Sequence, residues 1–237
     1  MKGKNSHYPS KNLQSFILKR MKTEKADGFI KRGTFSDEIV WGNNSYIFSS
    51  LDKEKRISFN KSLFLFTMVK KDARLYLKNN KNIKLPKKYP QIEFASKVNE
   101  ESLGDITGTD LNHAYWRIAY NMGIISPKTY EKGLNDDFKS VRLSALSTLG
   151  ANKTYQKIKA GEPINEYLIN KGDENLKKVY ILIRYTCYKY MNKVKKMLGD
   201  DFLCYKTDCL YYINTKENRD MVTDFFKEQN LEMKQLV

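Results

Sequence analysis

One long amphipathic helix is predicted between Glu174 and Leu198, and it constrains how the C-terminal half of the chain folds. Its apolar side chains recur at helical spacing: Val179, Leu182, Ile183, Met191, Val194 and Leu198. Gly199 follows at once, in the position where a glycine commonly ends a helix. Two short apolar runs then flank Lys206, Thr207 and Asp208, and they predict a β-hairpin that turns at these residues.

Shorter elements precede and follow this pattern. Strands are expected near Ile92–Val98 and at Ile106, and the second strand leads into Asp110. Helical patterns are expected at 114–119, at 127–133, at 136–149 and, before an apolar end at 231–237, at 217–229. This order predicts an α+β fold in which helices pack on one face of an antiparallel sheet.

The first 90 residues predict a basic N-terminal region. Apolar side chains follow Ser10 at helical spacing, so residues 10–22 predict a short amphipathic helix with Ser10 as its N-cap. A glycine-asparagine turn between two apolar runs predicts a β-hairpin over 38–48. The stretch 62–77 fits either a helix or a strand. The polar segment 78–90 is the best candidate for a boundary, so we expect domains at 1–90 and 91–237.

The chain is strongly basic, because 43 Lys and Arg against 27 Asp and Glu give a formal charge of +16. Residues 1–100 hold 22 basic and 9 acidic side chains, so most of the excess lies in this part. Such a field attracts polyanions, and nucleic acid is the commonest such partner. A lysine-rich proteome, in which lysine is the default surface residue, is the alternative explanation. Charge alone does not separate RNA from DNA.

Composition also disfavours several classes of protein. No apolar run approaches the ~20 residues of a membrane helix, and the N-terminus lacks the apolar core of a secretory signal. The 3 cysteines lack the spacing of a zinc site and favour a reducing compartment, so we expect a cytoplasmic protein. The histidines are His7 and His113, which disfavours zinc hydrolases and Ser-His-Asp triads because both depend on well-placed imidazoles.

Two aspartates stand where a metal-dependent phosphoryl transfer needs them. Asp110 follows a predicted strand, and Asp208 lies in the predicted hairpin turn. Phosphoryl transfer to a 3′-hydroxyl can be run by two Mg²⁺ ions about 3.5–4 Å apart, clamped between two carboxylates. Mg²⁺ keeps water and substrate phosphates as ligands, so two aspartates suffice from the protein. Each aspartate also has an ordinary structural explanation, as an N-cap at Asp110 and as a turn residue at Asp208.

The segments around these aspartates resemble motifs in the palm of family B DNA polymerases, the class common in viruses and phages. The family's Asp-x-x-Ser-Leu-Tyr-Pro is matched by Asp-Leu-Asn-His-Ala-Tyr-Trp, which keeps Asp110 and Tyr115. Its Tyr-Gly-Asp-Thr-Asp-Ser is matched by Cys-Tyr-Lys-Thr-Asp-Cys. The metal-binding second aspartate of that motif is kept as Asp208, and Lys206 replaces the first.

A third motif lies between these two, in the order that the family has. Lys-x-x-x-Asn-Ser-x-Tyr-Gly is matched from Arg142, which replaces the lysine, with Ser147 and Gly150 kept. The resemblance covers about residues 90–237. It implies a palm-like sheet with abbreviated helical fingers at about 124–160.

The resemblance implies a role for each matched position. Asp110 and Asp208 would bind the catalytic Mg²⁺ or Mn²⁺ ions. Tyr115 would pack under the sugar of the incoming nucleoside triphosphate and exclude a 2′-hydroxyl. The other implied nucleotide contacts are the phosphate ligands Arg142 and Lys139, and Ser147 and Gly150 beside the nascent base pair. The protein would then be a DNA-binding nucleotidyltransferase of DNA replication, in the host cytoplasm if a phage encodes it, with RNA open as the alternative partner.

Departures from the family keep other functions open. Lys206 would repel cations beside a two-metal site. The segments expected for a proofreading exonuclease and a thumb are missing, so the basic N-terminal region or a second subunit would have to hold the primer–template. A polymerase-derived protein without catalytic activity, which binds nucleic acid, assists replication or sits in a virion, is the alternative. An unrelated basic α+β domain with accidental motif matches is the third hypothesis.

Overall fold

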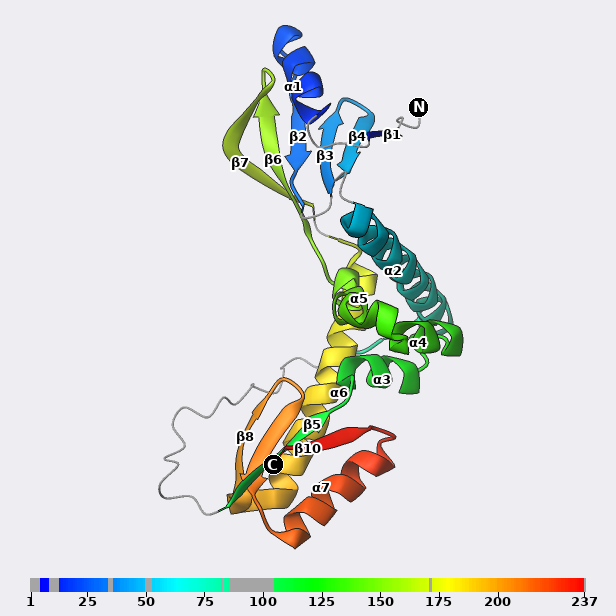
Figure 1. The fold of residues 1–237 in the computed structure, drawn as a ribbon, viewed down its shortest axis with the longest axis vertical. Helices are drawn as coiled ribbons and strands as arrows, with labels where there is room; N and C mark the ends of the chain where they lie inside the picture. The colour runs from blue at the N-terminus through cyan, green and yellow to red at the C-terminus, as the bar shows by residue number, and fades with distance from the viewer. Residues whose placement is uncertain are drawn as a thin grey trace. The chain divides into compact units, whose positions relative to one another are not determined.

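The computed structural model describes residues 5–8, 13–33, 36–49, 53–81, 83–85, 105–170 and 172–236. They form an α+β fold of helices and two sheets, which confirms the predicted class (Figure 1). The chain divides into two compact units. The first unit holds residues 1–67 and 150–174, and the second unit holds residues 68–149 and 175–237.

This division differs from the predicted boundary at residue 90. The first change of unit falls within the helix α2 (Lys53–Asn79), and the segment 150–174 belongs with the N-terminal residues. The reason is hydrogen bonding, because the strand β6 (Lys153–Lys159) pairs with β2 (Gly28–Lys31). Polar composition along the chain does not reveal such long-range pairing.

The first unit is built on a six-stranded sheet in the order β1-β4-β3-β2-β6-β7. β1 runs parallel to β4, and the other neighbouring strands are antiparallel. The remaining bounds are Asn5–Tyr8 for β1, Ser36–Trp41 for β3, Asn44–Ser49 for β4 and Glu162–Asn170 for β7. β3 and β4 form the hairpin predicted over 38–48. Gly42 in its turn has φ +55°, a left-handed conformation that glycine adopts without a steric penalty.

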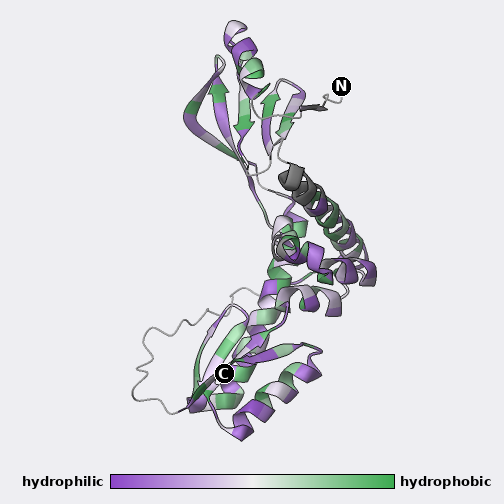
Figure 2. Ribbon diagram, viewed as in Figure 1, coloured by the Kyte–Doolittle hydropathy of each residue, from purple (hydrophilic) through white to green (hydrophobic). Residues whose placement is uncertain are grey.

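A small hydrophobic core joins this sheet to the helix α1 (Gln14–Thr23). The helix contributes Ile17 and Met21, and the strands contribute Ile30, Ile39, Phe48 and Ile158. The helix predicted over 10–22 is confirmed from residue 14 onward, whereas Ser10 lies outside the described residues. Figure 2 shows the same pattern by hydropathy, with hydrophobic residues gathered on the strands and hydrophilic residues along much of α1.

The second unit is built on a four-stranded antiparallel sheet in the order β10-β5-β9-β8. The bounds are Ile106–Leu111 for β5, Phe202–Lys206 for β8, Cys209–Ile213 for β9 and Met233–Leu236 for β10. β8 and β9 form the hairpin predicted around Asp208, and β5 is the strand predicted at Ile106. The strand predicted near Ile92–Val98 lies outside the described residues.

Helices accompany the second sheet in this unit. Their bounds are Ala114–Asn121 for α3, Pro127–Leu134 for α4, Lys139–Ala145 for α5, Glu174–Leu198 for α6 and Lys216–Glu228 for α7, with single 3₁₀ turns at Asp136–Phe138, Ser147–Leu149 and Gly199–Asp201. The predicted long helix is confirmed as α6, and Gly199 after it has φ +57°. The ambiguous stretch 62–77 is helical within α2. The rings of Tyr188 on α6 and Tyr205 on β8 lie 6.4 Å apart, so α6 packs on the sheet.

The helical fingers expected at 124–160 need correction in their second part. α4 and α5 are helices, but residues 153–159 form the strand β6 of the first unit. A bulge between Gln156 and Ile158 shifts the register of β6, and this interrupts the alternation by which a strand is recognised in sequence. Among the described helices, none combines the length and the apolar character needed to cross a membrane.

Candidate active site

Asp110 and Asp208 come together through the pairing of β5 with β9. Asp110 is the register partner of Cys209, the residue that directly follows Asp208. The backbone N–H of Leu111 donates a hydrogen bond of 3.0 Å to the carbonyl oxygen of Asp208. The hairpin turn is tight, since Thr207 has φ +60°. Two aspartates 98 positions apart in the sequence therefore lie on adjoining backbone at one end of the sheet.

The two carboxylates affect each other electrostatically. Asp208 is half-buried, and burial together with the nearby Asp110 carboxylate raises the pKa of Asp208. Two like charges that share a partly desolvated site repel each other. A divalent cation bound between them would relieve that repulsion, which is the electrostatic setting of a carboxylate metal site.

A cavity of about 150 Å³ brings four of the predicted residues together. Tyr115, Arg142, Ser147 and Asp208 all line it, although they lie on four different segments of the second unit. His113, Ala114, Trp116, Leu146 and Tyr180 complete the lining. The cavity joins the hairpin turn to α3, α5 and α6.

The other three predicted positions do not line this cavity. Asp110 lies beside the turn that carries Asp208, on the neighbouring strand. Lys139 is exposed at the start of α5, three residues before Arg142, and its charge helps to lower the pKa of His113. Gly150 is the first residue of the segment that belongs to the other unit.

Arg142 is held in place by its neighbours. Its side chain is buried, and its Nη1 donates a hydrogen bond of 2.7 Å to the carbonyl oxygen of Gly133. Its Nη2 lies 2.9 Å from Nδ1 of His113. Burial lowers the pKa of Arg142, and burial and the Arg142 charge both lower the pKa of His113. A neutral imidazole accepts the Arg142 hydrogen bond, so the histidine orients the guanidinium at the cavity wall.

His113 owes its position to an unusual backbone conformation. It is the N-cap of α3 with φ 56° and ψ 36°, in the left-handed region, and its side chain does not cap the helix. Outside glycine this conformation is uncommon, and histidine, asparagine and aspartate are the residues that adopt it most readily. Sequence analysis found no partner for this histidine, because Arg142 is 29 residues away.

Tyr115 is supported from α6. Burial raises the pKa of Tyr115, and Cys187, a hydrogen bond with Tyr188 and the charge of Asp208 act in the same direction. Tyr188 in turn accepts a hydrogen bond of 2.9 Å from Nη2 of Arg184. Arg184 and Tyr188 therefore support Tyr115 from α6. The resemblance of this helix to the palm helix of the family includes Arg184, whereas no motif indicated Tyr188. Both residues hold the Tyr115 phenol as a neutral group beside Asp208.

Lysines flank Asp110 on its own face of the sheet. Lys234 on β10 is the register partner of Asp110, and Lys206 on β8 is the register partner of Cys209. Register partners in an antiparallel sheet project on the same face, so Lys206, Cys209, Asp110 and Lys234 form one row across four strands. Both lysines are exposed. The face is therefore more cationic than a pair of aspartates alone would be.

Asp110 and Asp208 are the residues of the site that could hold a metal ion. Among the described residues, no group of three or more His, Cys, Asp and Glu side chains is arranged to hold one. Asp110 and Asp208 supply two carboxylates, and Mg²⁺ accepts such a set when water and substrate phosphates complete its shell.

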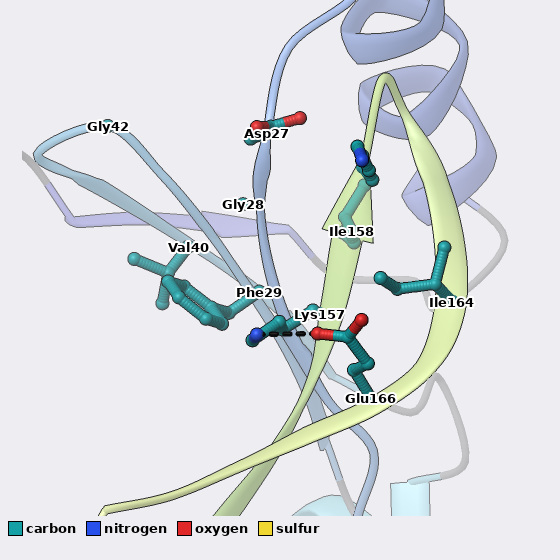
Figure 3. A pocket seen from close by; sticks show the side chains of 10 residues that line it. Asp27, Gly28, Phe29, Val40, Gly42, Lys157, Ile158, Ile164 and Glu166 are labelled. Carbon is teal, nitrogen blue, oxygen red and sulfur yellow. Dashed lines mark hydrogen bonds and ion pairs between the residues drawn. The ribbon is translucent and has the colours of Figure 1, made fainter.

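A larger cavity lies in the first unit (Figure 3). It measures about 510 Å³, and its lining mixes apolar side chains such as Phe29, Val40 and Ile164 with lysines and carboxylates. The ammonium group of Lys157 pairs with the carboxylate of Glu166 at 2.6 Å, as Figure 3 shows. The other carboxylate, Asp27, accepts a hydrogen bond of 2.9 Å from the backbone N–H of Ala160, so this cavity does not offer the paired aspartates that the sequence predicts.

Comparisons with known proteins add no relative to this description. No protein-family model, no curated protein and no solved structure matches the chain.

Proposed function

We propose that the protein is a nucleotidyltransferase that resembles a minimal family B DNA polymerase and transfers a nucleotide to a nucleic-acid 3′-hydroxyl. One observation carries this proposal. Tyr115, Arg142, Ser147 and Asp208 were selected from sequence motifs alone, and all four line one cavity. Of the other two matched residues, Asp110 adjoins the turn of Asp208 through the β5–β9 register, and Gly150 lies outside the cavity. Unrelated residues with accidental motif matches have no reason to converge in this way.

Different residues of the cavity bind different parts of a nucleoside triphosphate in this proposal. Arg142 offers a buried, oriented guanidinium, and such a group binds phosphate with charge-assisted hydrogen bonds. Tyr115 stands beside Asp208 as a neutral phenol, and in this proposal its ring packs under the sugar. His113 and Gly133 keep Arg142 aimed at the cavity.

Mg²⁺ or Mn²⁺ held by Asp110 and Asp208 would supply the activation of the 3′-hydroxyl and the neutralisation of the leaving pyrophosphate. The protein's own part is positioning and charge. We place this reaction in the cytoplasm, with DNA as the polymer and with a second subunit that helps to hold the primer–template. RNA remains the alternative polymer.

Primer extension tests the proposal. The wild-type protein is compared with Asp110→Asn and Asp208→Asn on a primed DNA template with Mg²⁺ or Mn²⁺. Asp200→Asn is the matched control, because Asp200 is an exposed carboxylate of the same unit. We expect the wild type and the control to extend the primer, and each site variant to lose roughly 100-fold or more of the activity, because a direct metal ligand is removed. Equal extension by all four proteins would refute the proposal.

The second candidate function is nucleic-acid binding without catalysis. The row that places Lys206 and Lys234 on the same face as Asp110 favours it, because ammonium groups there bind phosphates and oppose cations. This function predicts no primer extension by the wild type, and salt-sensitive DNA binding that is unchanged in Asp110→Asn and Asp208→Asn. Gain of primer extension in Lys206→Asp would show that the lysine suppresses activity on an otherwise competent site.

A further inference from the structure

A basic groove runs between α6 and α7 in the second unit, apart from the cavity described above. Its volume is about 480 Å³. The side chains that matter are three lysines and three aromatic residues: Lys189, Lys193, Lys196, Tyr185, Tyr190 and Phe225. No carboxylate is among the described residues that line it. The groove therefore carries three positive charges without a neutralising partner in its lining.

The three lysines project from one side of α6. Their spacing of four and three residues puts them on neighbouring turns of the same helix face. All three are exposed, and from Lys189 to Lys196 they cover about 10 Å of the helix axis at 1.5 Å per residue. Phosphates of a stacked nucleic-acid strand are about 3.4 Å apart along the axis, so three or four successive phosphates span the same length.

Aromatic rings stand beside the lysines. The ammonium of Lys193 lies 5.0 Å from the centroid of the Phe225 ring, a cation–π contact between α6 and α7. The rings of Tyr190 and Phe225 meet edge to face at 6.1 Å. Burial raises the pKa of Tyr190, so its phenol stays protonated and can donate a hydrogen bond to an anion. Basic side chains interleaved with aromatic rings are the pattern by which proteins hold single-stranded nucleic acid.

The groove is distinct from the candidate active site. Tyr180 lines the catalytic cavity and lies on the same helix as the three lysines. At 1.5 Å per residue, Lys189 and Lys196 are about 13 and 24 Å from Tyr180 along the axis of α6. A strand bound over the lysines would thus lie outside the cavity that Asp208 and Arg142 line.

We propose that the α6–α7 groove binds single-stranded nucleic acid through its phosphates, independently of the nucleotide-binding cavity. The lysines neutralise successive phosphates, and the Tyr190 hydroxyl donates a hydrogen bond to the bound strand. Such a surface keeps the polymer attached while the catalytic cavity is empty. The binding itself needs neither metal nor nucleotide.

The salt dependence of binding tests this proposal. The probe is a fluorescent poly-dT oligonucleotide, titrated by anisotropy between 50 and 200 mM salt in the presence of a chelator. The groove variant carries Lys189→Gln, Lys193→Gln and Lys196→Gln. The matched control carries Lys71→Gln, Lys78→Gln and Lys81→Gln, which remove the same charge from exposed positions on and after α2. Both variants are also made on the Asp208→Asn background, so a failure of catalysis leaves this test intact.

Each lost phosphate contact reduces the slope of log affinity against log salt by about 0.7 for a single strand. Three contacts amount to a slope change of about 2. The affinity of both proteins falls when the salt concentration rises fourfold, but the factor by which it falls should be roughly 20-fold smaller for the groove variant than for the wild type. The control variant should keep the wild-type slope, with or without Asp208→Asn. The proposal is overturned if the groove variant keeps the wild-type slope, if the control loses as much, or if the wild type binds polyglutamate but not the oligonucleotide.

Discussion

A closed ring of hydrogen bonds under β5 leads to the sharpest prediction about stability. The Tyr212 hydroxyl and Oγ1 of Thr109 lie 2.9 Å apart, and Thr109 donates to Oε1 of Gln235 at 3.1 Å. Nε2 of Gln235 donates back to the Tyr212 hydroxyl at 3.1 Å and to Oγ1 of Thr107 at 2.7 Å. Thr109 and Tyr212 are fully buried. The ring joins β9, β5 and β10, and so it keeps Lys234 in register with Asp110.

The geometry sets the expected energies. Thr109→Val keeps the shape of the side chain but leaves the Tyr212 hydroxyl without its acceptor and Oε1 of Gln235 without its donor. Each buried polar group left unsatisfied costs about 1–3 kcal/mol, partly offset by the added methyl group, so we expect a loss of about 2–3 kcal/mol. Tyr212→Phe removes the two bonds of this hydroxyl, to Thr109 and Gln235, but Gln235 and Thr109 each keep another partner, so it should cost about 1–2 kcal/mol. The double variant no longer strands the hydroxyl, so it should be more stable than the sum of single effects predicts by about 1–2 kcal/mol.

Urea unfolding of the four proteins measures this coupling. Trp116 lies in the second unit, and Trp41 lies in the first, so a Trp41→Phe background makes tryptophan fluorescence report on the second unit. The free energy of unfolding is taken from each midpoint at a common slope. Additivity of Thr109→Val and Tyr212→Phe within about 0.5 kcal/mol would refute the ring, because residues in contact should couple.

Three further predictions concern the surroundings of the cavity. In Gly133→Ala, the new Cβ clashes with the ring of Trp116, and we expect a loss of about 1–3 kcal/mol in urea unfolding with a change in Trp116 fluorescence. The pKa of His113 is lowered from its ordinary 6.5 by burial and by Arg142, so the unfolded state takes up this proton first and stability falls as the pH drops below about 6.5. His113→Gln should lose less stability than the wild type between pH 7 and pH 5. An equal loss in both proteins would show that protonation of His113 does not cause the pH dependence. The Asp72 carboxylate accepts three hydrogen bonds from the residues that cap and begin α4. Asp72→Ala should therefore lower the free energy of unfolding by about 1–3 kcal/mol, measured by thermal unfolding. An unchanged unfolding midpoint would show that Asp72 does not stabilise the start of α4.

Elements with a strong local period could be predicted from the sequence. α6 repeats its apolar side chains at helical spacing along its whole length, and the structure places it at the predicted residues. The hairpin around Asp208 follows from two short apolar runs and polar turn residues. The proximity of Asp110 and Asp208 needed more than local pattern, since β5 and β9 pair across a long interval. The ordered motifs supplied that information.

Features that depend on long-range pairing could not be predicted. The hairpin of β6 and β7 joins the first sheet by pairing with β2, and the bulge at Gln156 obscures its alternation. Tyr167, Leu168 and Ile169 at the end of β7 are all largely exposed, so that strand shows no inside–outside pattern. The contact between His113 and Arg142 likewise depends on how α3 and α5 pack. The spacing of apolar residues in the sequence does not predict such a contact between side chains.

Binding of Mn²⁺ to the two aspartates tests the central claim most directly. Electron paramagnetic resonance counts free Mn²⁺ in the presence of a nucleoside triphosphate analogue that cannot react. We expect the wild type and Asp200→Asn to bind Mn²⁺ when the nucleotide is present. Asp110→Asn and Asp208→Asn should each bind the ion about 10- to 100-fold more weakly. If all four proteins bind Mn²⁺ equally, or none binds it, the two carboxylates do not form a metal site.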